Sequence, residues 1–237
     1  MRVVPAAFFH GRNKSILFDM DGTIICTEPL HIQAWVKVCH HLGISSDSIS
    51  KERIPGISGM VTAEQLSQQL LQQTQRRKSP NEIYKIKSEA YRSFLQQAPL
   101  KDVEIPGFRT FFQSLSCQKG LITSSPRIEV NMVLKILGID QASFGSIISK
   151  ENVKIPKPAP EGYFLSMEKM RVQANICLGF EDSLSGITAL ISAGVKNIVV
   201  IGTSLSQQQL TTFMANYEGV NYSYIKNYNE LNPDYSR

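Results

Sequence analysis

The chain has 237 residues, 42% of them hydrophobic, and a formal net charge of +5. This length accommodates one large α/β domain or a core domain with a smaller partner, and the composition excludes a disordered or fibrous protein. No apolar run approaches the ~20 residues that a membrane span needs, so no membrane partner is expected. The basic residues are scattered apart from the short run Arg76–Lys78, so nucleic acid is not an expected partner either.

The four cysteines form no CxxC pair and show no metal-type spacing with histidine. This pattern favours free thiols in a reducing cytoplasm and gives no indication of zinc. Residues 1–14 are a poor secretory signal, because their apolar stretch is short and contains Pro5. We therefore predict a cytoplasmic protein, with a monomer as the default state.

The first predicted element is a buried strand over residues 15–19, followed by acids and Gly22. Residues 29–99 are predicted to be mostly helical, since apolar residues recur at helical spacing within 30–42 and 62–74. A further helix is expected to begin at Ser79-Pro80-Asn81-Glu82, which has a capping residue, an early proline and a glutamate three positions after the cap.

From residue 105 onward, predicted helices and short apolar strands alternate. The expected helices are 107–118, 127–137, 161–170 and 185–193, and the expected strands are 120–125, 144–148, 176–180, 197–201 and 222–225. Such alternation predicts a doubly wound, Rossmann-like parallel sheet with helices on both faces. The sequence thus predicts an α/β core domain of residues 1–28 and 100–237, with an inserted helical domain at 29–99.

In a sheet of this kind, ligands bind beyond the carboxyl ends of the strands. Four polar loops are expected at that edge, and the first contains Asp19, Asp21 and Gly22. Alternate residues of an extended segment face the same way, so one acid can attack phosphorus while the other donates and recovers a proton. Gly22 allows a sharp turn with backbone N–H groups toward a phosphate. A calcium loop or a capping turn is the alternative, but the further ligands of an EF-type calcium loop are absent.

The second loop, with Thr123 and Ser124, places hydroxyls before a helix N-terminus, where they can hold anionic oxygens or simply cap the helix. In the third, flanking prolines hold Lys157, which can neutralise phosphate or a carboxylate, or be an ordinary surface lysine. The fourth contains Glu181 and Asp182, which suit Mg²⁺ better than zinc, or else form an exposed acidic turn. The joint occurrence of these four loops, in order, favours the functional interpretation.

With these motifs, the chain resembles the haloacid dehalogenase-like superfamily of phosphatases and phosphomutases over nearly all of residues 15–202. The helical insertion resembles the small cap domain of the β-phosphoglucomutase-like subfamily, and the run from Asp19 to Thr23, followed by His31 and Trp35, fits that subfamily. The resemblance implies that Asp19 is the nucleophile and Asp21 the general acid/base.

The same resemblance implies a Mg²⁺ site formed by Asp19, the backbone carbonyl of Asp21 and Asp182, with Glu181 nearby or bound through water. It also implies that Thr123 and Lys157, helped by the Ser124 amide, hold the transferring phosphoryl group. The cap is expected to exclude water and select the substrate.

In the cap, the resemblance assigns substrate contacts to the loop that contains Gly56 and Ser58, and His31 is expected to couple cap closure to Asp21 or to pack within its helix. Two positions depart from the family pattern. Cys26 stands where an acid is usual, and Gly59 stands where β-phosphoglucomutases carry an arginine for a second phosphate. The missing guanidinium argues against mutase activity, with Lys51 or Arg53 as cations that could take its place.

The leading hypothesis is therefore a Mg²⁺-dependent phosphatase acting on a small phosphorylated metabolite, such as a sugar phosphate. The first alternative is a phosphomutase of the β-phosphoglucomutase type. The second is a non-enzymatic binding module on the same scaffold. Asp21 excludes dehalogenase chemistry, because dehalogenases of this fold lack that acid.

Overall fold

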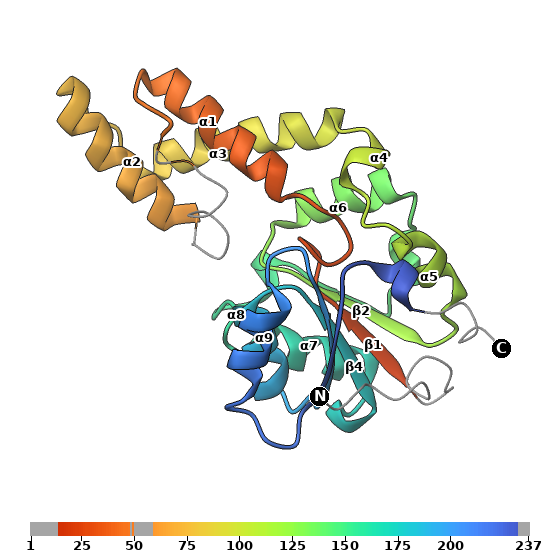
Figure 1. The fold of residues 1–237 in the computed structure, drawn as a ribbon. Coiled ribbons are helices and arrows are strands. Elements are labelled where there is room, and N and C mark those ends of the chain that lie inside the picture. The colour runs from red at the N-terminus through yellow and green to blue at the C-terminus, as the bar shows by residue number, and fades with distance from the viewer. Residues whose placement is uncertain (1–13, 48, 50–58, 232–237) are drawn as a thin grey trace. The chain divides into compact units, whose positions relative to one another are not determined.

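The computed structural model describes residues 14–47, 49 and 59–231 (Figure 1). The chain divides into two compact units. One comprises Met1–Cys26 with Leu100–Arg237, and the other comprises Thr27–Pro99. Among the described residues, none of the helices combines the length and the hydropathy that a bilayer span requires.

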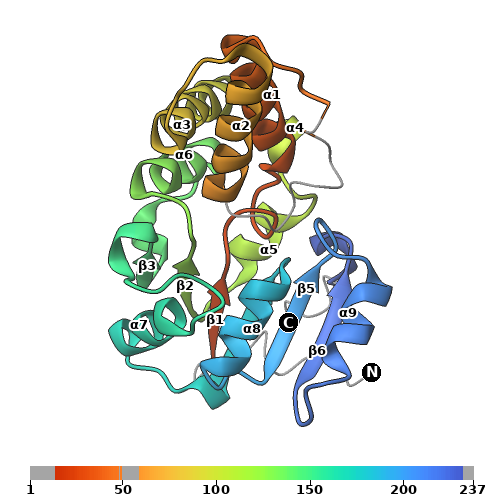
Figure 2. The same cartoon turned by 90° about the vertical axis from the view of Figure 1, so that its left-hand side faces the viewer.

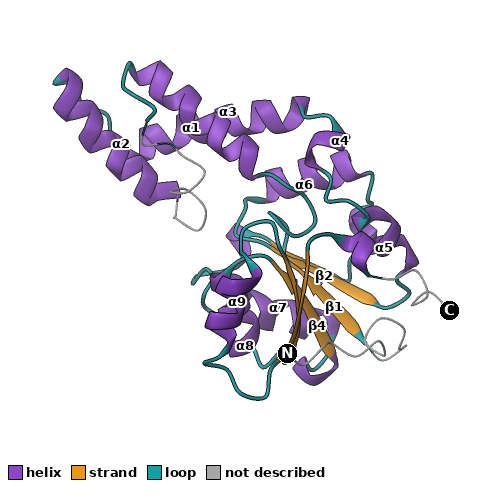
Figure 3. Cartoon of the chain, viewed as in Figure 1, coloured by secondary structure: helices purple, strands orange, loops and turns teal. Residues whose placement is uncertain are grey.

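The larger unit is built on a parallel sheet, drawn in orange in Figure 3. Its strand order is β3-β2-β1-β4-β5-β6. The strands are β1 (Ser15–Phe18), β2 (Gln118–Ile122), β3 (Ser146–Ile148), β4 (Cys177–Glu181), β5 (Asn197–Ile201) and β6 (Asn221–Ile225). The first strand lies inside the sheet, paired with β2 on one side and β4 on the other. Phe18 is level with Leu121 and Phe180, so the loops that follow these strands leave the sheet at one edge. The predicted α/β fold with a parallel sheet is confirmed.

The helices of this unit cover both faces of the sheet. They are α4 (Leu100–Val103), α5 (Phe108–Ser114), α6 (Arg127–Leu137), α7 (Glu161–Met170), α8 (Leu184–Ser192) and α9 (Gln207–Met214). Helices α7, α8 and α9 lie on one face, and α5 lies on the other (Figures 1 and 2). On the first face, buried aliphatic side chains such as Leu17, Leu190 and Leu210 form the core. On the second, Phe18 packs against Phe108 and Phe112.

The smaller unit consists of the helices α1 (Glu28–Leu42), α2 (Gly59–Thr74) and α3 (Pro80–Gln97). Their apolar faces bury a core that includes Trp35, Leu66 and Ile83. Ser79 caps α3 as predicted, because its side chain accepts from the Glu82 amide while the Glu82 carboxylate accepts from the Ser79 amide.

Two predicted elements end three or four residues earlier in the structure than the sequence predicts. The strand expected at 120–125 is Gln118–Ile122, because the chain turns at Thr123, whose hydroxyl accepts from the Ser125 amide. The helix expected at 107–118 ends at Ser114. The next residue, Leu115, has an extended backbone conformation and is buried. The spacing of Phe108, Phe112 and Leu115 fits a helix, but the backbone changes direction before the last of them.

Candidate active site

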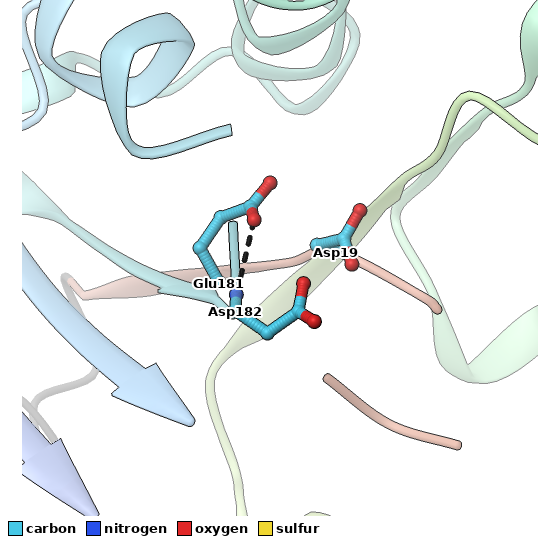
Figure 4. A group of neighbouring side chains, drawn as sticks. All are labelled: Asp19, Glu181 and Asp182. Atoms are coloured by element: carbon cyan, nitrogen blue, oxygen red, sulfur yellow. Dashed lines mark hydrogen bonds between the residues drawn. The ribbon is translucent and has the colours of Figure 1, made fainter. Parts of the chain in front are cut away.

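Three buried carboxylates gather where β1 and β4 end. Asp19 directly follows β1, Glu181 is the last residue of β4, and Asp182 comes next. One carboxylate oxygen from each lies within 4.8 Å of the others. Figure 4 shows the three side chains, with the hydrogen bond from the Asp182 amide to Glu181. The parallel register of β1 and β4 produces this cluster, since Phe18 pairs with Phe180 and the acids Asp19 and Glu181 come next on the two neighbouring strands.

The positively charged ammonium group of Lys157 lies beside these carboxylates. Its Nζ lies 2.6 Å from Asp19 Oδ1 and 2.7 Å from Glu181 Oε1, and it also donates to the carbonyl of Ile122 at 3.2 Å. Burial alone would lower the pKa of Lys157, but the charges of Asp19 and Glu181 outweigh it and hold the pKa well above its usual value. The lysine therefore stays charged and touches the carboxylate of Asp19 directly.

Glu181 is fully buried, and both of its carboxylate oxygens are engaged by donors. Oε1 accepts from Lys157 and from the hydroxyl of Tyr163 at 2.9 Å. Oε2 accepts from the Asp182 amide, the Ser183 amide and the Ser183 hydroxyl at 3.0–3.2 Å. These five bonds fix the side chain and compensate its charge, which is what a buried carboxylate requires.

Asp182 is held from the loop that follows β5. Its Oδ2 accepts from Thr203 at 3.2 Å and also from Ser204, while Thr203 donates to the carbonyl of Gly22 at 2.6 Å. Burial, and next the charge of Glu181, raise the pKa of Asp182 to about 7. Gly22 has a φ of +80°, and a Cβ at this position would overlap the Asp182 carboxyl, so the close approach of the two loops requires glycine.

Asp21 lies in the same loop as Asp19 but has a separate set of partners. Its Oδ2 accepts from the Ser125 hydroxyl at 2.7 Å and from the Thr123 hydroxyl at 3.4 Å. Thr123 is buried, and Ser124 between the two hydroxyl residues is exposed. The structure thus brings the first and second predicted loops together through hydrogen bonds to Asp21.

The remaining predicted site residues belong to the smaller unit or lie outside the described residues. Gly56 and Ser58 are outside them. His31 is on α1, where its ring stacks on Tyr91 at a centroid distance of 3.9 Å and its Nδ1 lies 2.6 Å from Lys87 Nζ. Both of these partners are on α3, so these contacts of His31 are packing contacts within the smaller unit.

Four residues of the site were not predicted as such from the sequence. They are Ser125, Tyr163, Thr203 and Ser204, each of which binds one of the acids. Thr203 and Ser204 follow a predicted strand, so the rule that ligands gather beyond strand ends would have indicated them. Tyr163 lies inside a helix and gave no local signal.

The carboxylate cluster has the chemistry of a site for a hard divalent cation. The three carboxylates, with one ammonium beside them, carry a formal charge of −2 when all are ionised. Burial and the charge of Glu181 raise the pKa of Asp19 well above its ordinary value, although Lys157 opposes the rise. Oxygen ligands and unbalanced negative charge fit Mg²⁺, which binds through one or two carboxylates and retains several waters.

Comparison with known proteins agrees with this geometry. Residues 14–194 match the model of the haloacid dehalogenase-like hydrolases. The fructose-1-phosphate phosphatase of Escherichia coli K12 is 31% identical, over 80% of this chain and 97% of its own length. The phosphorylated carbohydrates phosphatase of Thermotoga maritima is 29% identical, over 81% of this chain and 87% of its own.

Among solved structures, the β-phosphoglucomutase of Clostridium difficile superposes with a TM-score of 0.70 at 26% identity, covering 94% of each chain. The expected hydrolase class and the expected resemblance to β-phosphoglucomutase-like proteins are both confirmed. The parallel sheet, the acids at its carboxyl edge and the match over most of the length lead to one assignment: the chain belongs to the haloacid dehalogenase-like hydrolase family.

Proposed function

We propose that the chain is a Mg²⁺-dependent phosphatase that hydrolyses a small phosphorylated metabolite, in particular a sugar phosphate, through an aspartyl-phosphate on Asp19. The observation that carries the proposal is the contact between Asp19 and Lys157 beside two further acids. A structural ion pair would need only one carboxylate for one lysine. The two further carboxylates leave net negative charge that a divalent cation would offset. This arrangement suits a site that binds a cation together with a phosphate. The names of the relatives from Escherichia coli and Thermotoga maritima support the substrate class.

In the proposed reaction, a carboxylate oxygen of Asp19 attacks the phosphorus of the monoester, so that a new P–O bond forms while the ester P–O bond breaks. Asp21 donates its proton to the departing alcohol oxygen. Asp21 then takes a proton from a water that attacks the phospho-aspartate, which releases phosphate and restores Asp19. Two acids in one short loop can perform these roles because their partners differ: Lys157 for Asp19, and Ser125 for Asp21.

Lys157 and the second loop supply the electrostatic part of the mechanism. The ammonium of Lys157 is fixed by Asp19, Glu181 and the Ile122 carbonyl, so it needs little rearrangement to meet phosphoryl oxygens. We assign phosphoryl binding to Thr123 and the Ser124 amide as well. Bound Mg²⁺ would offset negative charge on Asp19 and the phosphate.

For the metal itself, we assign Asp19 and Asp182 as the carboxylate ligands, together with the backbone carbonyl of Asp21. Glu181 already accepts five hydrogen bonds, so we assign it a supporting role, near the ion or bound through water. Thr203 and Ser204 orient the Asp182 carboxyl, as partners of metal ligands commonly do.

We propose that the helical unit, Thr27–Pro99, is the substrate-selecting cap, and that Gly56, Ser58 and His31 take part in that selection. Four free cysteines support a reducing compartment such as the cytoplasm. A monomer acting on a small metabolite stays part of the proposal.

A phosphomutase of the β-phosphoglucomutase type is the second candidate, favoured by the superposition on the Clostridium difficile enzyme. A mutase must hold a bisphosphate by its second phosphate, and Gly59 offers no side chain for that contact. A dependence of turnover on a sugar bisphosphate would favour the mutase.

The test is phosphate release from a panel of sugar and other small phosphate esters, beginning with fructose 1-phosphate, with Mg²⁺ and with a chelator. Asp19→Asn is the principal variant, and Asp140→Asn, an exposed Asp in a turn of the same unit, is the matched control. We expect metal-dependent turnover in the wild type and in Asp140→Asn, and its loss in Asp19→Asn. Wild-type protein that is inactive on every ester and in a bisphosphate-primed isomerisation assay would instead support a binding module.

A further inference from the structure

The last described segment of the chain returns from the sheet edge to the helix that precedes β2. After β6, the chain forms a short turn, Tyr228–Glu230, which lies beside α5 (Figure 1). The Tyr228 amide donates to the carbonyl of Pro106 at 3.0 Å. Gly107, with a φ of +82°, leaves room for this turn, because a Cβ there would overlap Asn229. The turn is therefore docked through backbone contacts.

The side chain of Tyr228 enters the aromatic core beneath the site. It is 2% exposed, and its ring stacks on Phe180 at a centroid distance of 5.6 Å and an interplanar angle of 20°. Phe180 in turn contacts Phe18 at 5.0 Å. These two phenylalanines immediately precede Glu181 and Asp19, so Tyr228 packs on the residue before Glu181, which in turn packs on the residue before Asp19.

The hydroxyl of Tyr228 reaches the loop that contains the two reacting acids. It donates to the carbonyl of Thr23 at 3.1 Å in a buried bond that joins residues 205 positions apart. Thr23 lies two residues beyond Asp21 and is itself fully buried. The loop has its own turn bonds, since the amides of Thr23 and Ile24 both donate to the carbonyl of Met20. The bond from Tyr228 ties this local turn to the rest of the core.

The hydroxyl is suited to this role because it stays protonated. Burial, followed by the charges of Asp19 and Asp182, holds the pKa of Tyr228 well above its ordinary value. A neutral phenol remains a donor throughout the pH range in which a phosphatase works, so its bond to the Thr23 carbonyl persists.

We propose that Tyr228 is a positioning residue, which fixes the Asp19–Thr23 loop in the geometry that phosphoryl transfer needs. The residue lies beyond 194, where the match to the family model ends, so this contribution comes from a part of the chain outside the match. The effect on catalysis rests on the proposed function. The anchoring of the loop does not, and it can be measured in a protein without substrate.

Tyr228→Phe keeps the ring and removes only the donor, and Tyr217→Phe is the control, since Tyr217 packs on Phe213 in the same unit. Two quantities are compared at a temperature where all three proteins are folded. One is hydrogen exchange of the backbone amides in peptides covering residues 19–26, without metal or substrate. The other is kcat and KM for p-nitrophenyl phosphate with Mg²⁺.

In Tyr228→Phe, we expect exchange in this loop to rise by about tenfold, the order of effect of one lost hydrogen bond with a buried acceptor left behind. We expect kcat to fall by ~10- to 100-fold, because small displacements of reacting groups have effects of that size, with KM changed less than twofold. Tyr217→Phe should match the wild type in both measurements.

Unchanged exchange in the loop would overturn the proposal, whatever the kinetics. Faster exchange with an unchanged kcat would also overturn it, since the bond would then serve structure alone. Should the wild type show no phosphatase activity, the proposed function fails and exchange alone decides the anchoring: a rise specific to residues 19–26 supports it, and no rise refutes it.

Discussion

The ammonium of Lys157 lies 2.6 Å from the carboxylate of Asp19, although the two residues are 138 positions apart in the sequence. Both side chains are only 11% exposed, and Glu181 shares the lysine from the other side. The ammonium of Lys157 compensates the negative charge of both acids. Removing it would leave two buried carboxylates without a cationic partner.

Replacing Lys157 by methionine should therefore destabilise the protein and abolish its activity. Breaking a buried ion pair by removing one partner costs about 3–5 kcal/mol. The free energy of unfolding, measured by urea denaturation at neutral pH with a chelator, is expected to fall by about that amount. Lys154→Met is the matched control, since Lys154 is an exposed neighbour in the same segment. Equal stability of the two variants would contradict the prediction.

Thr203→Val should weaken magnesium binding more than it weakens the fold. The substitution keeps the shape of the side chain but removes its bonds to the Asp182 carboxylate and the Gly22 carbonyl. Loss of such a supporting bond commonly lowers metal affinity by about 10- to 100-fold. Calorimetric titration with Mg²⁺ measures the effect. Thr211→Val, which removes a bond to the Gln207 carbonyl on the surface of α9, should leave the affinity unchanged.

Stability without metal should depend on pH through Asp182. Burial, and then Glu181, raise its pKa from 3.8 to about 7, so between these values the folded protein binds more protons at this group than the unfolded chain does. The contribution of Asp182 to the free energy of unfolding therefore falls as pH rises through this range, by up to about 1.4 kcal/mol per pH unit. Relative to wild type in chelator, Asp182→Asn should become more stable as pH is raised from 5 to about 7. A constant difference between the two proteins would argue against the shift.

In the folded protein, the thiols of Cys39 and Cys177 should resist alkylation. Burial raises the pKa of Cys39 to about 11 and that of Cys177 to about 12, and both side chains are fully buried. At pH 8, only on the order of one thiol in a thousand or fewer is then ionised at either position. Iodoacetamide labelling followed by peptide mass mapping should leave both unmodified until urea is added. Rapid modification of either residue in folded protein would contradict the assignment.

The main acids and the lysine of the site could be predicted because each lies at the end of an apolar strand or in the loop that follows it. Asp19, Lys157, Glu181 and Asp182 meet as a consequence of the parallel register, which the alternation of strands and helices indicates. Helix bounds could be predicted equally well where a local signal ends the helix, as Gly138 does for Arg127–Leu137.

The supporting contacts could not be predicted, because they join parts of the chain with no local relation. The bonds from Tyr163 to Glu181, from Thr203 to Gly22 and from Tyr228 to Thr23 span 18, 181 and 205 positions. Whether a hydroxyl meets a carboxylate or a backbone carbonyl over such separations depends on how two surfaces pack, and neither propensity nor periodicity contains that information. The sequence alone therefore assigns no role to Tyr228.

The bond between Tyr228 and Thr23 also relates the site to the order of synthesis. Asp19, Lys157 and Asp182 are all translated before residue 183, yet the tyrosine whose hydroxyl donates to the Thr23 carbonyl is added some 45 residues later. Since domains fold progressively from the N-terminus during synthesis, a nascent chain would carry every charged group of the cluster before the bond from Tyr228 to the Thr23 carbonyl could form. The loop from Asp19 to Thr23 would then gain this buried hydrogen bond only after residue 228 has been synthesised, so its final geometry would be completed later than the set of charged groups beside it.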